Sequence, residues 1–220
     1  MKRQILLTAF VALSTFAIAQ SPSFGIRAGI SSSAMSGDAV SSLNDLVDYT
    51  GGAITTRGRT GFFAGGNVSI PLGGQVSLEP GLYYSQKGYE MKGELNIKGA
   101  GFLGANAKAQ LNTHYIDVPV VLKANFSGFE VFAGPQVSYL VQADLRTRAG
   151  VLGFNILNKT MDATDQLNRW DAGITGGVGY RFTNGVSLSA SYDHGLSRTD
   201  ANQNFEAYNR SLKVGIGYNF

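Results

Sequence analysis

The stretch SLKVGIGYNF (211–220) ends the chain and alternates to its last residue. Leu212, Val214, Ile216, Tyr218 and Phe220 are apolar, whereas the residues between them are polar or glycine. A period of two indicates a strand with one buried face. Chain termini usually fray, and a large ring gains nothing by being exposed to water there. The pattern therefore predicts that the last strand, including Phe220, packs against an apolar environment.

The same period recurs along the whole chain after the first twenty residues. Seven further segments alternate in this way, at 24–30, 62–70, 76–87, 114–126, 129–142, 170–182 and 186–193. Each segment is a weak signal alone, but eight together, separated by turn residues, are typical of a membrane barrel. We therefore predict an all-β fold, an eight-stranded antiparallel up-and-down transmembrane β-barrel.

The connections between these segments alternate in length. Tight, glycine-bearing or two-residue turns are expected at 72–75, 127–128 and 183–185. Long and mostly polar loops are expected at 31–60, 91–112, 143–168 and 197–209. Partial alternation in MKGELNIKG (91–99) leaves open whether these loops extend their strands above the membrane. Within the first of these, helical spacing is compatible with a short surface helix, at Val40, Leu43, Leu46 and Val47. Short turns on one side and long loops on the other are typical of short periplasmic turns and long extracellular loops.

Aromatic residues on the apolar face fall into two groups. One group lies beside the tight turns and termini: Phe24, Phe126, Phe129, Tyr180, Phe182, Tyr218 and Phe220. The other lies toward the long loops: Phe62, Tyr84, Tyr139, Trp170 and Tyr192. A soluble barrel would place such rings in its core, and alternation alone does not separate inside from outside. Two rings that flank an aliphatic band instead indicate an aromatic girdle at each membrane interface, with Phe220 facing lipid.

The first residues, MKRQILLTAFVALSTFAIAQ (1–20), have a basic start, an apolar stretch and a small-x-small cleavage site. We predict a cleaved signal peptide at 1–19 and a barrel domain at 20–220. Loss of Lys2 and Arg3 brings the net charge of +3 close to neutral, which gives no electrostatic argument for nucleic acid. The absence of cysteine excludes a disulfide and a lipoprotein anchor at the cleavage site.

Several segments resemble the PorT-like outer-membrane β-barrel family, which is common in Bacteroidetes. They are LEPGLYYSQKG (78–88), HYIDVPVVLKANF (114–126), FAGPQVSYLV (132–141), GVGYRFTNGVSLSASYDHGLS (177–197) and LKVGIGYNF (212–220). The resemblance implies an eight-stranded barrel with a periplasmic amino terminus. It implies no activity, although the founding member is a component of a secretion machinery.

The polar face of the strands carries nine charged residues, which we expect to form a paired network in the lumen. They are Arg27, Glu79, Lys87, Asp117, Lys123, Asp171, Arg181, Asp193 and Lys213. The interior of an eight-stranded barrel is only wide enough for side chains, so charges there must pair or stay hydrated. The middle of the network is expected at Glu79, Asp117, Lys123 and Arg181. A proton or ion path is the functional alternative to a packed polar core.

Catalysis is not expected from this sequence. Its two histidines are His114 and His194, and Asp193, Ser191 and Ser197 lie close to His194. Adjacent strand residues point to opposite faces, so Asp193 and His194 do not form a working pair. The sequence also lacks a metal-ligand cluster, a phosphate-cradling loop and a nucleophile elbow, so no cofactor or metal is expected.

These observations favour a non-enzymatic outer-membrane barrel with a filled polar lumen, whose long loops contact an external or membrane partner. Alternatives are an accessory subunit of a secretion or envelope-assembly complex, a lipid-modifying enzyme centred on His194, and a narrow channel. The expected partners are outer-membrane lipid and, during assembly, the barrel-insertion machinery, which reads a terminal aromatic residue. A membrane-complex partner is left unidentified.

Overall fold

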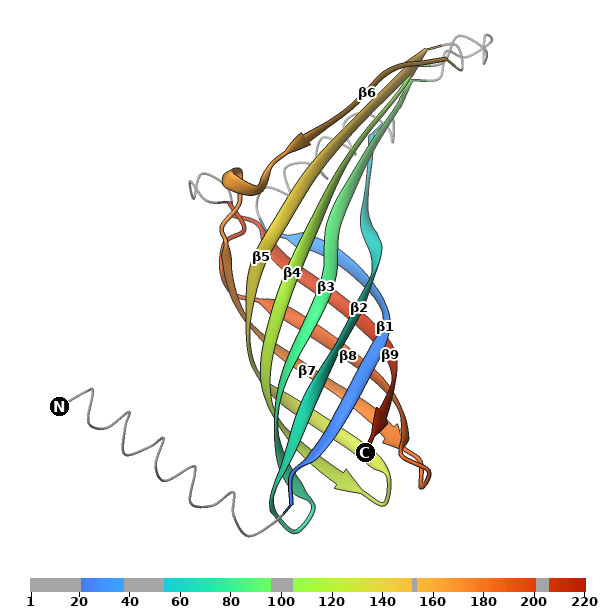
Figure 1. The fold of residues 1–220 in the computed structure, drawn as a ribbon. Helices are drawn as coiled ribbons and strands as arrows, with labels where there is room; N and C mark the ends of the chain where they lie inside the picture. The colour runs from blue at the N-terminus through green and yellow to red at the C-terminus, as the bar shows by residue number, and fades with distance from the viewer. Residues whose placement is uncertain (1–20, 38–53, 96–104, 152–153, 201–205) are drawn as a thin grey trace, which may run out of the picture.

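The computed structural model describes residues 21–37, 54–95, 105–151, 154–200 and 206–220. Within them the chain is almost entirely β-strand (Figure 1). The elements are β1 (Ser23–Ser36), β2 (Ile54–Gly73), β3 (Val76–Leu95), β4 (Ala105–Phe126), β5 (Phe129–Val151), β6 (Phe154–Asp162), the 3-10 turn η2 (Thr164–Gln166), β7 (Trp170–Arg181), β8 (Val186–Gly195) and β9 (Tyr208–Asn219). In the part of the chain described, no helix is long and apolar enough to cross a membrane.

Eight of these strands form a closed antiparallel ring, which confirms the predicted fold. The ring runs β1-β2-β3-β4-β5-β7-β8-β9 and closes where β9 pairs with β1, from Gly25 opposite Asn219 to Ser36 opposite Tyr208. The Phe220 amide also donates a hydrogen bond of 2.8 Å to the Phe24 carbonyl. Closure leaves no unpaired edge within the ring, which is the condition for crossing lipid with strands.

The apolar face of every strand in the ring points outward. On the closing strand, the exposed fractions of Ile216 and Phe220 are 57% and 72%, whereas Ser211 and Lys213 are buried. The interior of the barrel is therefore polar, unlike the apolar core of a soluble protein, and its fully buried side chains include Asp117 and serines. This arrangement fits an aliphatic exterior in lipid around a polar interior.

The three short connections are tight turns, as the sequence predicts. Left-handed backbone occurs at Gly73 and Gly74, at Ser127 and Gly128, and at Gly185. Glycine adopts positive φ without the steric cost that a Cβ imposes. These turns gather at the end of the barrel that also carries the carboxyl terminus (Figure 1).

The predicted long loops are largely strand, which corrects the sequence prediction. β3 continues to Leu95 and β4 begins at Ala105, inside the stretch 91–112 that reads as a loop. β5 likewise continues to Val151 and returns as β6, inside the expected loop 143–168. The upper parts of β2, β3, β4 and β5, with β6, form a five-stranded sheet beyond the ring, here called the extension (Figure 1). The surface helix considered for the first loop lies outside the described residues.

An apolar cluster closes the barrel where the extension begins. Tyr115, Leu140 and Ala143 are fully buried and pack with Ala163, at the start of η2. The Ala143 amide donates a hydrogen bond of 3.0 Å to the Thr164 hydroxyl, which fixes η2 against β5. Strand β6 descends from the extension to this point (Figure 1). We call this cluster the cap.

The β1–β9 seam provides a test of the closed ring. A Cβ at Gly29 would overlap the Val214 carbonyl of the facing strand, so Gly29→Val should destabilise the folded barrel by about 1–3 kcal/mol, the usual cost of overpacking. The measurement is the unfolding midpoint in urea, read from the electrophoretic mobility of folded and unfolded protein. Gly176→Ala is the control, because its Cβ would meet no atom closer than 3.6 Å. Equal midpoints for Gly29→Val and the parent would contradict this seam.

Candidate functional site

The nine charged residues predicted for the lumen all lie on the inner face of the ring. Seven are buried: Glu79, Lys87, Asp117, Lys123, Asp171, Asp193 and Lys213. Arg27 and Arg181 are half-buried. The strand alternation places them there, because inward and outward positions alternate along each strand. Seven of the nine belong to two separate clusters rather than to one network.

The lower cluster lies toward the tight turns and contains two cations and two carboxylates. Lys123 Nζ lies 2.7 Å from Glu79 Oε2 and 3.3 Å from Glu130 Oε2. Arg181 Nη2 lies 2.6 Å from Glu130 Oε1 and 4.0 Å from Glu79 Oε1. These four residues come from β3, β4, β5 and β7, so the cluster joins four strands and is electrically neutral.

The upper cluster lies beneath the cap and is also neutral. Lys213 Nζ bridges two carboxylates, at 2.9 Å from Asp117 Oδ2 and 2.7 Å from Asp193 Oδ2. Lys87 Nζ lies 3.1 Å from Asp117 Oδ1, and Ser85 donates a hydrogen bond of 2.6 Å to Asp117 Oδ2. A fully buried carboxylate is tolerated here because ammonium and hydroxyl donors surround it.

The expected middle of the network is divided between the clusters: Glu79, Lys123 and Arg181 belong to the lower one and Asp117 to the upper one. The sequence prediction also leaves out Glu130, although alternation places it on the polar face. Its position beside the turn at 127–128 gives no sign of its burial. Only the register across three strands brings it to Lys123 and Arg181.

Two predicted residues lie outside both clusters. The Arg27 guanidinium lies 5.4 Å from the centre of the Phe132 ring, at cation–π distance. Asp171 accepts a hydrogen bond of 2.8 Å from Asn209 Nδ2. Among the described residues, these contacts replace the ion pairs expected from sequence.

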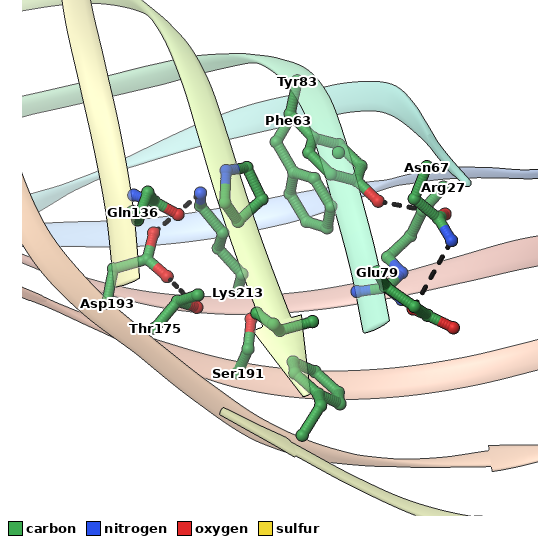
Figure 2. A pocket seen from close by; sticks show the side chains of 14 residues that line it. Arg27, Phe63, Asn67, Glu79, Tyr83, Gln136, Thr175, Ser191, Asp193 and Lys213 are labelled. Atoms are coloured by element: carbon green, nitrogen blue, oxygen red, sulfur yellow. Dashed lines mark hydrogen bonds and ion pairs between the residues drawn. The ribbon is translucent and has the colours of Figure 1, made fainter. Parts of the chain in front are cut away.

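A cavity of about 40 Å³ separates the clusters (Figure 2). Glu79 lines one part of it, where Asn67 bridges Glu79 and Tyr83, and Asp193 and Lys213 line another (Figure 2). The volume has room for about three water molecules. The space is a small polar gap between two neutral clusters, and it is too small for a substrate of ordinary size.

The predicted aromatic girdle lies on the outer surface of the ring. Phe24, Phe126, Phe129, Phe182, Tyr218, Phe220, Phe62, Tyr139, Trp170 and Tyr192 are exposed, and Tyr84 is half-buried. In the group toward the extension, rings on adjacent strands pack together. The ring centroids of Tyr139 and Trp170 are 4.9 Å apart, and those of Phe62 and Tyr84 are 5.5 Å apart. These two groups bound the apolar exterior.

The histidines do not assemble a catalytic site with the described residues. Asp193 points into the lumen, where Thr175 and Lys213 hold it, whereas His194 is exposed on the outer face. His114 also faces outward and hydrogen-bonds the Tyr84 hydroxyl. No group of three potential metal ligands occurs in the described part of the chain.

Comparison with known proteins identifies one matching family model, the outer membrane protein beta-barrel domain, over residues 18–201. No curated protein matches in sequence. Solved structures with a similar course of the chain include Neisserial surface protein A, with 13% identity, a TM-score of 0.48 and coverage of 91% of this chain and 100% of that one. The attachment invasion locus protein Ail of Yersinia pestis, in complex with the heparin analogue sucrose octasulfate, has 10% identity, a TM-score of 0.47 and the same coverages. The outer membrane protease OmpT of Escherichia coli has 10% identity, a TM-score of 0.39 and coverages of 93% and 100%.

The ion pairs of the lower cluster predict how substitutions of Lys123 and Glu79 change the stability of the folded barrel. Lys123→Met should destabilise the barrel by about 3–5 kcal/mol, because Glu79 and Glu130 would remain buried with Arg181 as their remaining ion-pair partner among the described residues. Adding Glu79→Gln removes the excess negative charge and should recover part of the loss. Urea midpoints of the folded barrel in mild detergent measure both effects. A Lys123→Met protein as stable as the parent would show that the ion pairs contribute nothing.

Proposed function

Because the chain belongs to the family of outer membrane protein β-barrel domains, we propose that it is a non-enzymatic, closed barrel that presents its extension to a partner outside the cell. The chain is a protein of the outer membrane. The length of the strands that form the extension is the observation that supports this proposal. A strand needs about 9–11 residues to cross the membrane, yet β2, β3, β4 and β5 have 20, 20, 22 and 23 residues.

The shape of the extension supports binding rather than transport. The strands on the other side of the ring are short, since β7 and β8 have 12 and 10 residues. One wall of the barrel therefore continues as a sheet beyond the ring, while the opposite wall ends with the ring (Figure 1). Among the described strands β6 is the last in the order and pairs with β5 alone, so we infer that its other edge can pair with another chain.

The separation of Asp193 from His194 supports a non-enzymatic role over a lipid-modifying hydrolase. The PorT-like resemblance stays a prediction, and with it the accessory-subunit alternative. The two proposals differ in whether the complex depends on the extension, because a subunit held in a complex through its barrel wall would not need the extension.

A filled lumen predicts little or no ion conduction. The two charge clusters and the cap obstruct the barrel, and the cavity between the clusters is about 40 Å³. Purified protein reconstituted into planar bilayers should give no steady current, with a general porin as the control for insertion. Large and stable single-channel openings would contradict the closed lumen.

Trimming the extension tests the proposed partner contact. Residues 92–108 and 146–160 can each be replaced by Asn-Gly, because Met91 lies opposite Ala109 and Leu145 opposite Met161 and this dipeptide suits a two-residue hairpin. Both proteins are extracted from their own outer membrane in mild detergent and run on native gels, with mass-spectrometric identification of co-migrating chains. The parent should migrate with a partner and the trimmed barrel alone.

Heat-modifiable mobility verifies that the trimmed barrel is folded. Co-migration that survives trimming would overturn the extension as the contact and would favour an accessory subunit held through the barrel wall. Migration of both proteins as lone barrels would exclude a stable protein partner.

A further inference from the structure

The outer face of the extension is a direct continuation of the lipid-facing surface. Along β4, Ile116 faces lipid and Tyr115 faces the lumen. Even-numbered positions therefore face outward, and the same side continues through His114, Gln110 and Lys108. Side chains on this face therefore point away from the axis of the barrel.

Among its described side chains, this outer face carries five cations and three carboxylates, Glu90, Asp144 and Asp162. Directly opposed residues of neighbouring strands share a face, and the register connects the members from β2 to β5. We call this set the basic face: Arg57, Lys92, Lys108, Arg146 and Arg148. Asp144 and Asp162 share the same side one row closer to the barrel. The other side of the extension carries one cation among its described side chains, Lys159, opposite Thr147.

Three of these cations form one cross-strand row. Lys92 lies opposite Lys108, and Lys108 lies opposite Arg148. Like charges placed directly opposite each other destabilise a sheet. Glu90 compensates part of the row, because its carboxylate lies 3.3 Å from Lys92 Nζ and 2.7 Å from Lys108 Nζ. The hydrogen bond from Lys108 lowers the pKa of Glu90, so this carboxylate stays ionised at neutral pH.

The height of the row above the membrane identifies what it faces. Ile116 lies opposite Tyr84 of the aromatic girdle, and Lys108 is eight residues farther along β4. At about 3.3 Å per residue and a tilt of about 40°, this places Lys108 roughly 20 Å outside the girdle. That level is above the lipid acyl chains and within the saccharide layer of the outer leaflet.

We propose that the basic face binds the phosphate- and carboxylate-bearing saccharides of glycolipids in the outer leaflet around the barrel. The continuity with the lipid-facing surface favours these neighbours over a ligand that approaches from solution. Guanidinium and ammonium groups match such anions, and Arg148, which is exposed, can form the bidentate pair that phosphate accepts. An anion between Lys108 and Arg148 would also offset their mutual repulsion.

The test measures binding of purified, phosphorylated lipopolysaccharide to the delipidated full-length barrel in mild detergent, by native mass spectrometry over a concentration series. Arg148→Gln should weaken binding about fivefold, the effect typical of one basic side chain at an anionic membrane surface, and Lys108→Gln/Arg148→Gln about twentyfold or more. Glu90→Gln should strengthen it, because Lys92 and Lys108 lose their carboxylate. The parent should also bind dephosphorylated lipopolysaccharide more weakly.

Lys159→Gln is the matched control, because it removes one exposed cation from the opposite face of the same sheet. Equal weakening by Arg148→Gln and Lys159→Gln would overturn the proposal, since net charge alone would then explain binding. Binding of the saccharide freed from its lipid as tightly as the intact glycolipid would also overturn it, in favour of a soluble glycan. The assay contains no other protein, so its outcome is independent of the partner proposed for the extension.

Discussion

Backbone hydrogen bonding in lipid is the constraint on which the rest of this structure depends. A strand that crosses a membrane has no water for its amide and carbonyl groups, so every group must pair with a neighbouring strand. The β9–β1 seam meets this requirement up to the amide of Phe220, which bonds to Phe24. Once the ring is closed in lipid, its apolar residues face outward and its polar residues face inward.

The polar interior then imposes a second requirement, neutralisation of charge within a narrow space. The two clusters meet it separately, with two cations and two carboxylates each. Their members come from strands that are distant in sequence, such as Asp117 of β4 and Lys213 of β9. A one-residue slip of a strand would turn its charge into lipid, so we infer that the clusters help to specify the register of the ring.

The ring could be predicted from the sequence because lipid makes the alternation strict. Phe24, Ile26 and Ile30 on β1 face outward at exposures of 56–63%, and this one-sided pattern is visible in the letters alone. The extension was not predictable in the same way. It has water around it, so residues 105–111, ANAKAQL, alternate small and polar side chains without a continuous apolar face. The pairing inside the lumen also depends on the register, so the sequence alone neither places Glu130 beside Lys123 nor separates Asp117 from the lower cluster.

The extension, unlike the ring, has open edges. Beyond the membrane neither face of a sheet is covered by lipid, and a flat sheet with open edges tends to associate with other chains. Charge on one face opposes such association, but it does not require cations to stand directly opposite each other, because alternating signs would serve as well and would stabilise the sheet. The row of Lys92, Lys108 and Arg148 therefore makes the sheet less stable than a row of alternating charges would. A cost of this kind is expected where the side chains meet an anion that is not part of the chain, at the level where the barrel leaves the membrane.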